Sequence, residues 1–98
     1  HAAQAQALLD DLAALDAQRC GLPPRVKDLQ TLSADRLANL LRHWLNALRD
    51  PQARASTAQL DELVRQIQAC TTRGHRIDLR VGSGFVRRSG EVLGWYNS

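Results

Sequence analysis

The sequence predicts an α+β fold, in which a three-helix unit is followed by a three-stranded antiparallel β-meander packed on it. Two observations support this prediction. Apolar residues recur at helical spacing as far as residue 70, and from residue 76 they alternate with polar residues as in half-buried strands. The 98 residues are enough for one domain with a small core, so we expect a single domain over residues 1–98.

The first helix is predicted over about residues 2–18, a segment rich in Ala and Leu. Gly21 and then Pro23 and Pro24 end it, because Gly accepts a left-handed turn and Pro cannot continue a helix. A polar connection follows through Asp28. The apolar residues of this helix form a narrow stripe of the kind that packs on a neighbour, namely Ala5, Leu8, Leu12 and Leu15.

The second helix, over about residues 34–49, has the clearest start. Ser33 is a favourable N-cap, Asp35 in the first turn complements the helix dipole, and Pro51 stops the helix. Its apolar residues form one continuous arc, so we expect it to be the central core helix. These residues are Leu37, Leu40, Leu41, Trp44, Leu45 and Leu48.

The third helix is predicted over about residues 57–70. Ser56 and Gln59 have the spacing of a capping box, in which each side chain bonds to the other residue's backbone N–H. Its buried stripe is predicted to contain Leu60, Leu63, Val64, Ile67 and Cys70.

The strands are predicted over about residues 76–81, 84–88 and 91–96. Gly82-Ser83 and Ser89-Gly90 separate them, and each pair suits a two-residue hairpin turn. A three-residue first turn would set Leu79 against Arg87 and spoil the sorting of the two faces. Two-residue turns pair Leu79 with Val86, Val86 with Leu93, Asp78 with Arg87, and Arg88 with Glu91.

The net charge lies entirely in the last 28 residues. Residues 1–70 carry eight bases and eight acids, whereas residues 71–98 carry five arginines and two acids, a balance of +3, with three of the four aromatic residues. A basic, aromatic unit on a neutral scaffold is typical of a polyanion-binding surface. The alternative is a group of solvated arginines with no ligand.

The predicted register gives the sheet one apolar face and one basic face. Guanidinium groups interleaved with aromatic rings can hold phosphates and stack on bases. For Phe85 a second interpretation stays open, in which the ring covers the gap opposite Gly94. The candidate RNA-binding residues are Arg76, Arg80, Arg87, Arg88 and Phe85, with Arg42 and Arg49 on the border of the second helix as weaker candidates.

No residue set in the sequence indicates catalysis or metal binding. His43 and His75 have no partner at metal-ligand spacing, and residues 82–84 lack the Lys and helix start of a P-loop. No apolar run is long enough to span a membrane. Cys20 and Cys70 are isolated, and we expect reduced thiols in a cytoplasmic protein.

Residues 36–45, which read RLANLLRHWL, resemble the start of the core helix in one family. The family is the bacterial tRNA(Ile)-lysidine synthetases, and the helix belongs to the substrate-binding domain after their catalytic domain. The resemblance covers residues 8–96. One departure is Gly84-Phe85, where family members often have Gly-Trp or Gly-Tyr. The matching residues outside the core helix are Leu29, Leu32, Ser33, Leu60–Leu63, Leu79, Arg80, Gly82, Arg87, Arg88 and Leu93.

The resemblance implies a non-catalytic domain that helps to position tRNA. The family uses ATP, with magnesium, to adenylate the wobble cytidine of an isoleucine tRNA and joins lysine to it. Its ATP-binding S-G-G-x-D-S loop lies in an N-terminal catalytic domain, and no such motif occurs here, so no cofactor is expected in this fragment. The chain contains no Met and starts at His1, so we expect a piece of a longer protein.

A protein-interaction or structural module is the competing prediction. In that case the leucines of the first helix, Leu8, Leu12 and Leu15, would dock on the missing catalytic domain or on a second copy of the chain.

Overall fold

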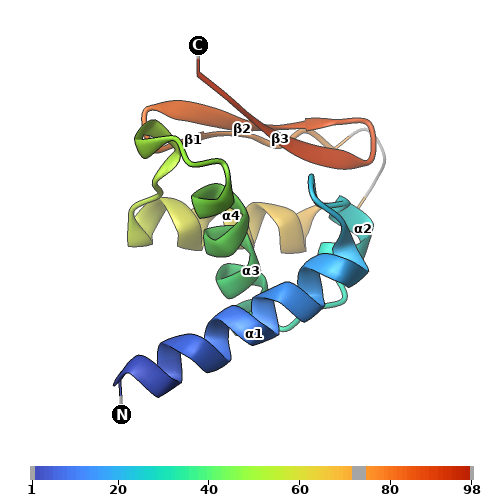
Figure 1. Ribbon diagram of the computed structural model, residues 1–98. Coiled ribbons are helices and arrows are strands. Elements are labelled where there is room, and N and C mark those ends of the chain that lie inside the picture. Colours follow the sequence, from blue (N-terminus) through green and yellow to red (C-terminus); the bar gives the residue numbers. More distant parts are fainter. Residues whose placement is uncertain (1, 72–74, 98) are drawn as a thin grey trace.

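The computed structural model describes residues 2–71 and 75–97. A layer of helices lies on one side of an antiparallel sheet, and α1 lies on the side of α3 away from that sheet (Figure 1). The predicted α+β class is therefore confirmed. The elements in order are α1 (Ala2–Cys20), α2 (Val26–Leu29), α3 (Ala34–Ala47), the 3₁₀ turn η1 (Pro51–Ala53), α4 (Thr57–Ala69), β1 (Asp78–Val81), β2 (Gly84–Ser89) and β3 (Val92–Tyr96).

Two of the helices begin at the residues that the sequence indicates. The Ser33 hydroxyl accepts a hydrogen bond from the backbone N–H of Arg36 at the start of α3. At the start of α4, Ser56 and Gln59 form the predicted capping box in both directions. Side chains therefore satisfy backbone N–H groups that a helix start leaves without partners.

One helix was not predicted. Residues 26–29 form the single turn α2 within the expected polar connection, and Val26 and Leu29 are buried in the core. A single turn is too short to show a helical period, so the apolar pattern could not reveal it.

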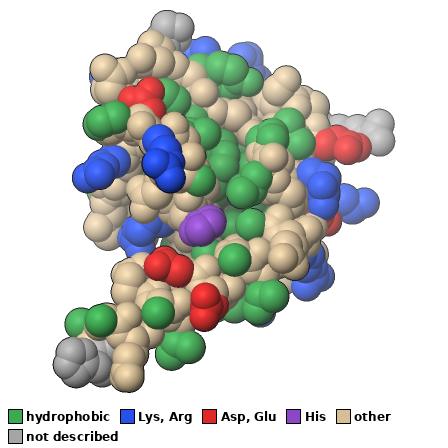
Figure 2. All heavy atoms as spheres, in the orientation of Figure 1, with side chains coloured by type: hydrophobic (Ala, Val, Ile, Leu, Met, Phe, Trp, Pro, Cys, Tyr) green, Lys and Arg blue, Asp and Glu red, His purple; other side chains and the backbone are tan. Residues whose placement is uncertain are grey.

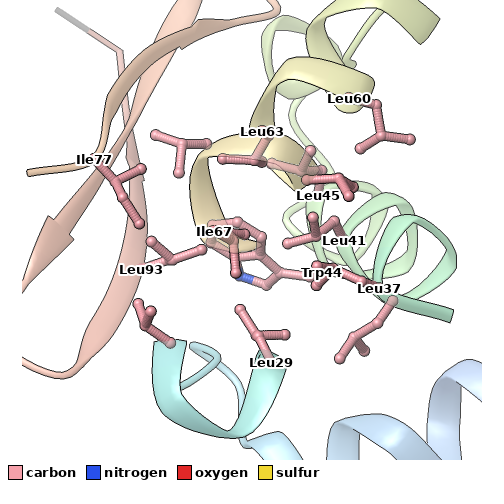
Figure 3. Close-up of a cluster of buried hydrophobic side chains, with 14 of the residues drawn as sticks. Leu29, Leu37, Leu41, Trp44, Leu45, Leu60, Leu63, Ile67, Ile77 and Leu93 are labelled. Atoms are coloured by element: carbon pink, nitrogen blue, oxygen red, sulfur yellow. The ribbon is translucent and has the colours of Figure 1, made fainter. Parts of the chain in front are cut away.

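The core lies between α2, α3, α4 and the inner face of the sheet. Figure 3 shows Leu29, Trp44, Ile67 and Leu93 pointing toward one another from these four parts of the chain. The predicted arc of α3 is buried, apart from the exposed Leu48 at its end. This confirms α3 as the central core helix.

Most of the predicted apolar stripe of α1 is exposed, and only Leu12 of its members is half-buried. Leu8 and Leu15 are 69% and 63% exposed, whereas Ala13, Asp16 and Cys20 are buried. The physical reason is an ion pair, because the buried Asp16 carboxylate accepts hydrogen bonds from the Arg36 guanidinium of α3. With Asp16 facing α3, Leu8 and Leu15 are left facing outward.

The first hairpin has the predicted register and the second does not. Leu79 pairs with Val86, and Asp78 with Arg87, around the turn Gly82-Ser83. The second turn falls at Gly90-Glu91, one residue later than predicted, since Gly90 adopts a left-handed φ of 63° there. The observed pairs are Val86 with Trp95, Arg88 with Leu93 and Ser89 with Val92, in place of Val86 with Leu93 and Arg88 with Glu91.

The sheet is fixed to the helical layer through the first hairpin turn. The backbone N–H of Gly82 donates to Oε1 of Gln59 at 2.9 Å, and that of Ser83 donates to the Gln52 carbonyl at 2.8 Å. A Cβ atom on Gly82 would lie 2.0 Å from the Gln52 oxygen, and its φ is 62°. The turn is therefore both left-handed and closely covered, which only glycine allows.

Candidate nucleic-acid interface

The strand alternation separates a covered face of the sheet from an open one. Val81, Val86 and Leu93 are fully buried against the helices, and Figure 1 shows none of the described helices on the opposite side. We call that opposite side the outer face. Strand pairing places Asp78, Arg80, Phe85, Arg87 and Tyr96 on it, and the exposed Arg76 lies just before β1.

Two arginines lie over the Phe85 ring. The guanidinium carbons of Arg87 and Arg80 are 4.8 and 5.8 Å from the ring centroid. Cations at these distances are attracted to the negative face of an aromatic ring. The sheet therefore holds two positive groups around one aromatic side chain, and a base stacking on Phe85 would have to compete with them.

The interpretation that Phe85 covers Gly94 is wrong. Phe85 pairs with Arg80 and Tyr96, whereas Gly94 pairs with Arg87. The Tyr96 hydroxyl lies 2.7 Å from the position that a Cβ of Gly94 would take. Tyr96 is therefore the aromatic residue that covers this glycine.

One carboxylate shares the outer face with the arginines. Nε of Arg87 donates to Oδ1 of Asp78 at 3.1 Å, and the two side chains are 43% and 47% exposed. An ion pair this exposed contributes little to stability. Its consequence is electrostatic, since the carboxylate offsets part of the positive charge of this face.

Arg88 points to the helix side of the sheet, unlike Arg87. Its Nε donates to the Gly90 carbonyl at 2.8 Å, and its Nη1 contacts the Cys70 sulfur and the His75 carbonyl. It nevertheless reaches the end of the sheet where β1 begins. There it lines a hollow of about 220 Å³ with His75, Arg76, Ile77, Asp78, Arg87 and Gly90.

The weaker candidates lie elsewhere. Arg42 is exposed on α3, and Arg49 is exposed just beyond the end of that helix, beside Asp50 and Arg54. In Figure 2 the Lys and Arg side chains occupy several separate places on the visible surface. The structure thus brings Arg80, Arg87 and Phe85 to one face and places Arg76 and Arg88 at the end of the sheet. Arg42 and Arg49 lie apart from this group.

We also looked for metal-binding groups and membrane-spanning helices among the described residues. Across residues 2–71 and 75–97, no group of three or more His, Cys, Asp or Glu side chains could hold a metal ion. None of the described helices is long and apolar enough to cross a membrane. Cys20 and Cys70 are buried, and burial, with smaller effects of Asp28 and Asp16, raises the pKa of Cys20.

The sequence reasoning missed the hollow at the start of β1. It joins side chains from both faces of the sheet with the approach to β1, so neither helical spacing nor alternation marks it. The one available signal was the pair Arg87-Arg88, whose members must point to opposite faces of a strand.

Fold and site together define a small α+β domain that presents a basic, aromatic sheet face. The model of the TilS substrate binding domain matches residues 25–93. The chain therefore belongs to the TilS substrate-binding-domain family.

Three relatives, each named tRNA(Ile)-lysidine synthase, are similar to this chain. One from Polaromonas naphthalenivorans (strain CJ2) is 56% identical over 93 residues, which are 95% of this chain and 27% of that protein. Those from Burkholderia pseudomallei (strain K96243) and Burkholderia mallei (strain ATCC 23344) are 47% and 44% identical over 73 and 77 residues, each 70% of this chain and 14% of the relative. The chain thus spans 27% or less of the length of these relatives, and no solved structure matches it.

Proposed function

We propose that this domain is the tRNA-contacting part of a tRNA(Ile)-lysidine synthase and that its outer face binds the phosphate backbone of the tRNA. The family membership and the name of the relatives support the substrate. The observation that supports the placement is the grouping of Arg80 and Arg87 on the open side of the sheet, with Arg76 beside the hollow at its end. Arg suits this task because its planar fork can give two hydrogen bonds to one phosphate.

The parent protein is proposed to be the ATP-dependent ligase that joins lysine to the wobble cytidine of tRNA(Ile). Its catalytic residues, together with the sites for ATP and magnesium, would lie outside the 98 residues. The role left for this domain is binding. Phosphate contacts fix the orientation of an RNA but carry little sequence information, so the domain would position the tRNA rather than select the base to be modified.

The test is tRNA binding by the 98-residue chain at a series of salt concentrations. Because each phosphate contact releases counterions, the affinity of the wild type should fall steeply as salt rises. The double variant Arg80→Glu and Arg87→Glu should bind several-fold more weakly. A matched control, Arg42→Glu with Arg49→Glu, makes the same charge change away from the outer face.

Two results would contradict the proposal. One is an affinity that does not respond to salt. The other is an equal loss in the two double variants, which would indicate that only total charge matters. Circular dichroism of each variant checks that the fold is retained.

A second candidate function is docking on another protein surface through α1. The exposure of Leu8 and Leu15 favours it, because large apolar side chains on one helix face often mark an interface. Sedimentation tests whether α1 docks on a second copy of this chain. Self-association that Leu8→Ser with Leu15→Ser abolishes would support pairing with a second copy, and a monomer at all concentrations would argue against that pairing.

A further inference from the structure

The hollow where β1 begins concentrates positive charge at one end of the sheet. Arg76, Arg87 and Arg88 line it, and His75 adds an imidazole. Asp78 contributes the only carboxylate among its described lining residues. A small concave site with three guanidinium groups has the charge that a phosphate requires.

Arg88 lines this hollow and hydrogen-bonds to two backbone carbonyls. Its Nε bonds to the Gly90 carbonyl and its Nη1 to the His75 carbonyl, so the guanidinium is fixed to backbone on two sides. It therefore supplies a positive charge whose position is already set. A preset charge lowers the cost of ordering side chains when a ligand binds.

Arg87 is the residue best placed to bind the ligand directly. Its guanidinium is held over the Phe85 ring at 4.8 Å, which restricts where the fork can lie. Its Nε already has an anionic oxygen, Oδ1 of Asp78, at 3.1 Å. A bidentate phosphate uses two nitrogens of the fork, so a carboxylate on Nε occupies one of the positions that such a phosphate would take.

We propose that this hollow is a phosphate subsite in which an RNA phosphodiester replaces the Asp78 carboxylate as the partner of Arg87. The inference rests on the proposed tRNA contact and adds two things to it. It places one phosphate at the start of β1, and it makes Asp78 a competitor that weakens the binding of RNA. Since the Asp78–Arg87 pair is about half exposed, little holds it together against a phosphate.

The experiment compares Asp78→Asn with Glu62→Gln in the 98-residue chain. Both changes remove one negative charge and one partner of an arginine, but Glu62 pairs with Arg65 within α4. The probe is a tRNA(Ile) transcript at two salt concentrations. Asp78→Asn should tighten binding by about three- to tenfold, and Glu62→Gln by less than about twofold, because surface charge effects fall off within a Debye length.

A double-mutant cycle shows whether the effect passes through Arg87. In the Arg87→Gln background, most of the gain from Asp78→Asn should disappear, since the guanidinium for which Asp78 and the phosphate compete is gone. Equal effects of Asp78→Asn and Glu62→Gln, weaker binding by Asp78→Asn, or a full gain in the Arg87→Gln background would each overturn the inference. Thermal unfolding of every variant shows that the comparison is made between folded chains.

Failure of the proposed function gives a different result. If the wild type and all variants fail to bind the transcript at low salt, the tRNA contact itself is refuted and the subsite with it. If the wild type binds in a salt-dependent way while Asp78→Asn matches Glu62→Gln, only the subsite is refuted.

Discussion

Helices α1 and α3 both carry leucines at spacings of three and four residues, yet they use them in opposite ways. Leu37, Leu40 and Leu41 of α3 are completely buried, whereas Leu8 and Leu15 of α1 are largely exposed. The Asp16–Arg36 pair joins the two helices, and the Asn39 side chain of α3 donates to the Leu9 carbonyl of α1 at 2.9 Å. Periodicity thus identifies the apolar side of a helix, but the partners available in space decide which side is covered.

The largest expected difference in stability is between substitutions of the buried leucines of α3 and the exposed leucines of α1. Leu41→Ala should lower the free energy of unfolding by about 2–5 kcal/mol, because it leaves a cavity in a packed core. Leu15→Ala should change it by less than about 0.5 kcal/mol, as is usual for a solvent-exposed side chain. Urea denaturation measures both, and a comparable loss in Leu15→Ala would show that this face of α1 is covered in solution.

The same contrast between covered and open positions holds for two glycines of the sheet. Gly82 and Gly90 have φ values of 62° and 63°, so alanine is strained equally at either position. A Cβ on Gly82 would meet the Gln52 carbonyl, whereas none of the described atoms lies within 4 Å of one on Gly90. Gly82→Ala should therefore be more destabilising than Gly90→Ala by about 1–3 kcal/mol. Equal melting temperatures would refute the proposed attachment of the sheet through this turn.

A smaller loss is expected when α1 loses its ion pair. Asp16→Ala should reduce stability by an amount between those of Leu15→Ala and Leu41→Ala, since Asp16 is 2% exposed but its partner Arg36 can turn toward water. The Asp16 carboxylate also raises the pKa of Arg36, through a hydrogen bond first and then through charge. Urea denaturation again gives the value. No change at all would mean that the ion pair does not stabilise the position of α1.

The smallest effect concerns the reactivity of Cys20 rather than stability. This thiol ends α1, and burial raises its pKa, so less thiolate is present in the folded chain than in the unfolded chain at pH 8. Alkylation by iodoacetamide should be slow in the wild type and faster in Asp16→Ala. Mass spectrometry of the labelled peptide follows the rate, and fast labelling of the wild type would show that the end of α1 is open.

The sequence was informative wherever one element determines its own geometry. The Ser33 and Ser56 caps and the Gly82-Ser83 turn depend on neighbouring residues, and all three were predicted correctly. The turn at Gly90 was placed one residue early, because Ser89-Gly90 and Gly90-Glu91 both put glycine in a two-residue turn. In the observed pairing, the backbone N–H of Leu93 in β3 donates to the Pro24 carbonyl in the loop before α2. The pattern of residues near the turn cannot reveal this long-range hydrogen bond.

The candidate site shows the same division. Alternation along β1 and β2 was enough to group Arg80, Phe85 and Arg87 on one face and to predict the Asp78–Arg87 pair. Alternation could not show that two guanidinium groups lie over the Phe85 ring. Nor could it show that the Arg88 side chain lines the hollow where β1 begins. Those features depend on side-chain direction, which a pattern of residue types does not specify.

Gln59 performs two tasks with one amide. Its oxygen receives the backbone N–H of Ser56 within the helix cap and that of Gly82 within the first hairpin. The start of α4 and the attachment of the sheet therefore depend on the same Gln59 oxygen atom. Loss of one of these two structures should weaken the other. The domain should therefore melt as one cooperative unit, with loss of helix and loss of strand signals coinciding along the same curve.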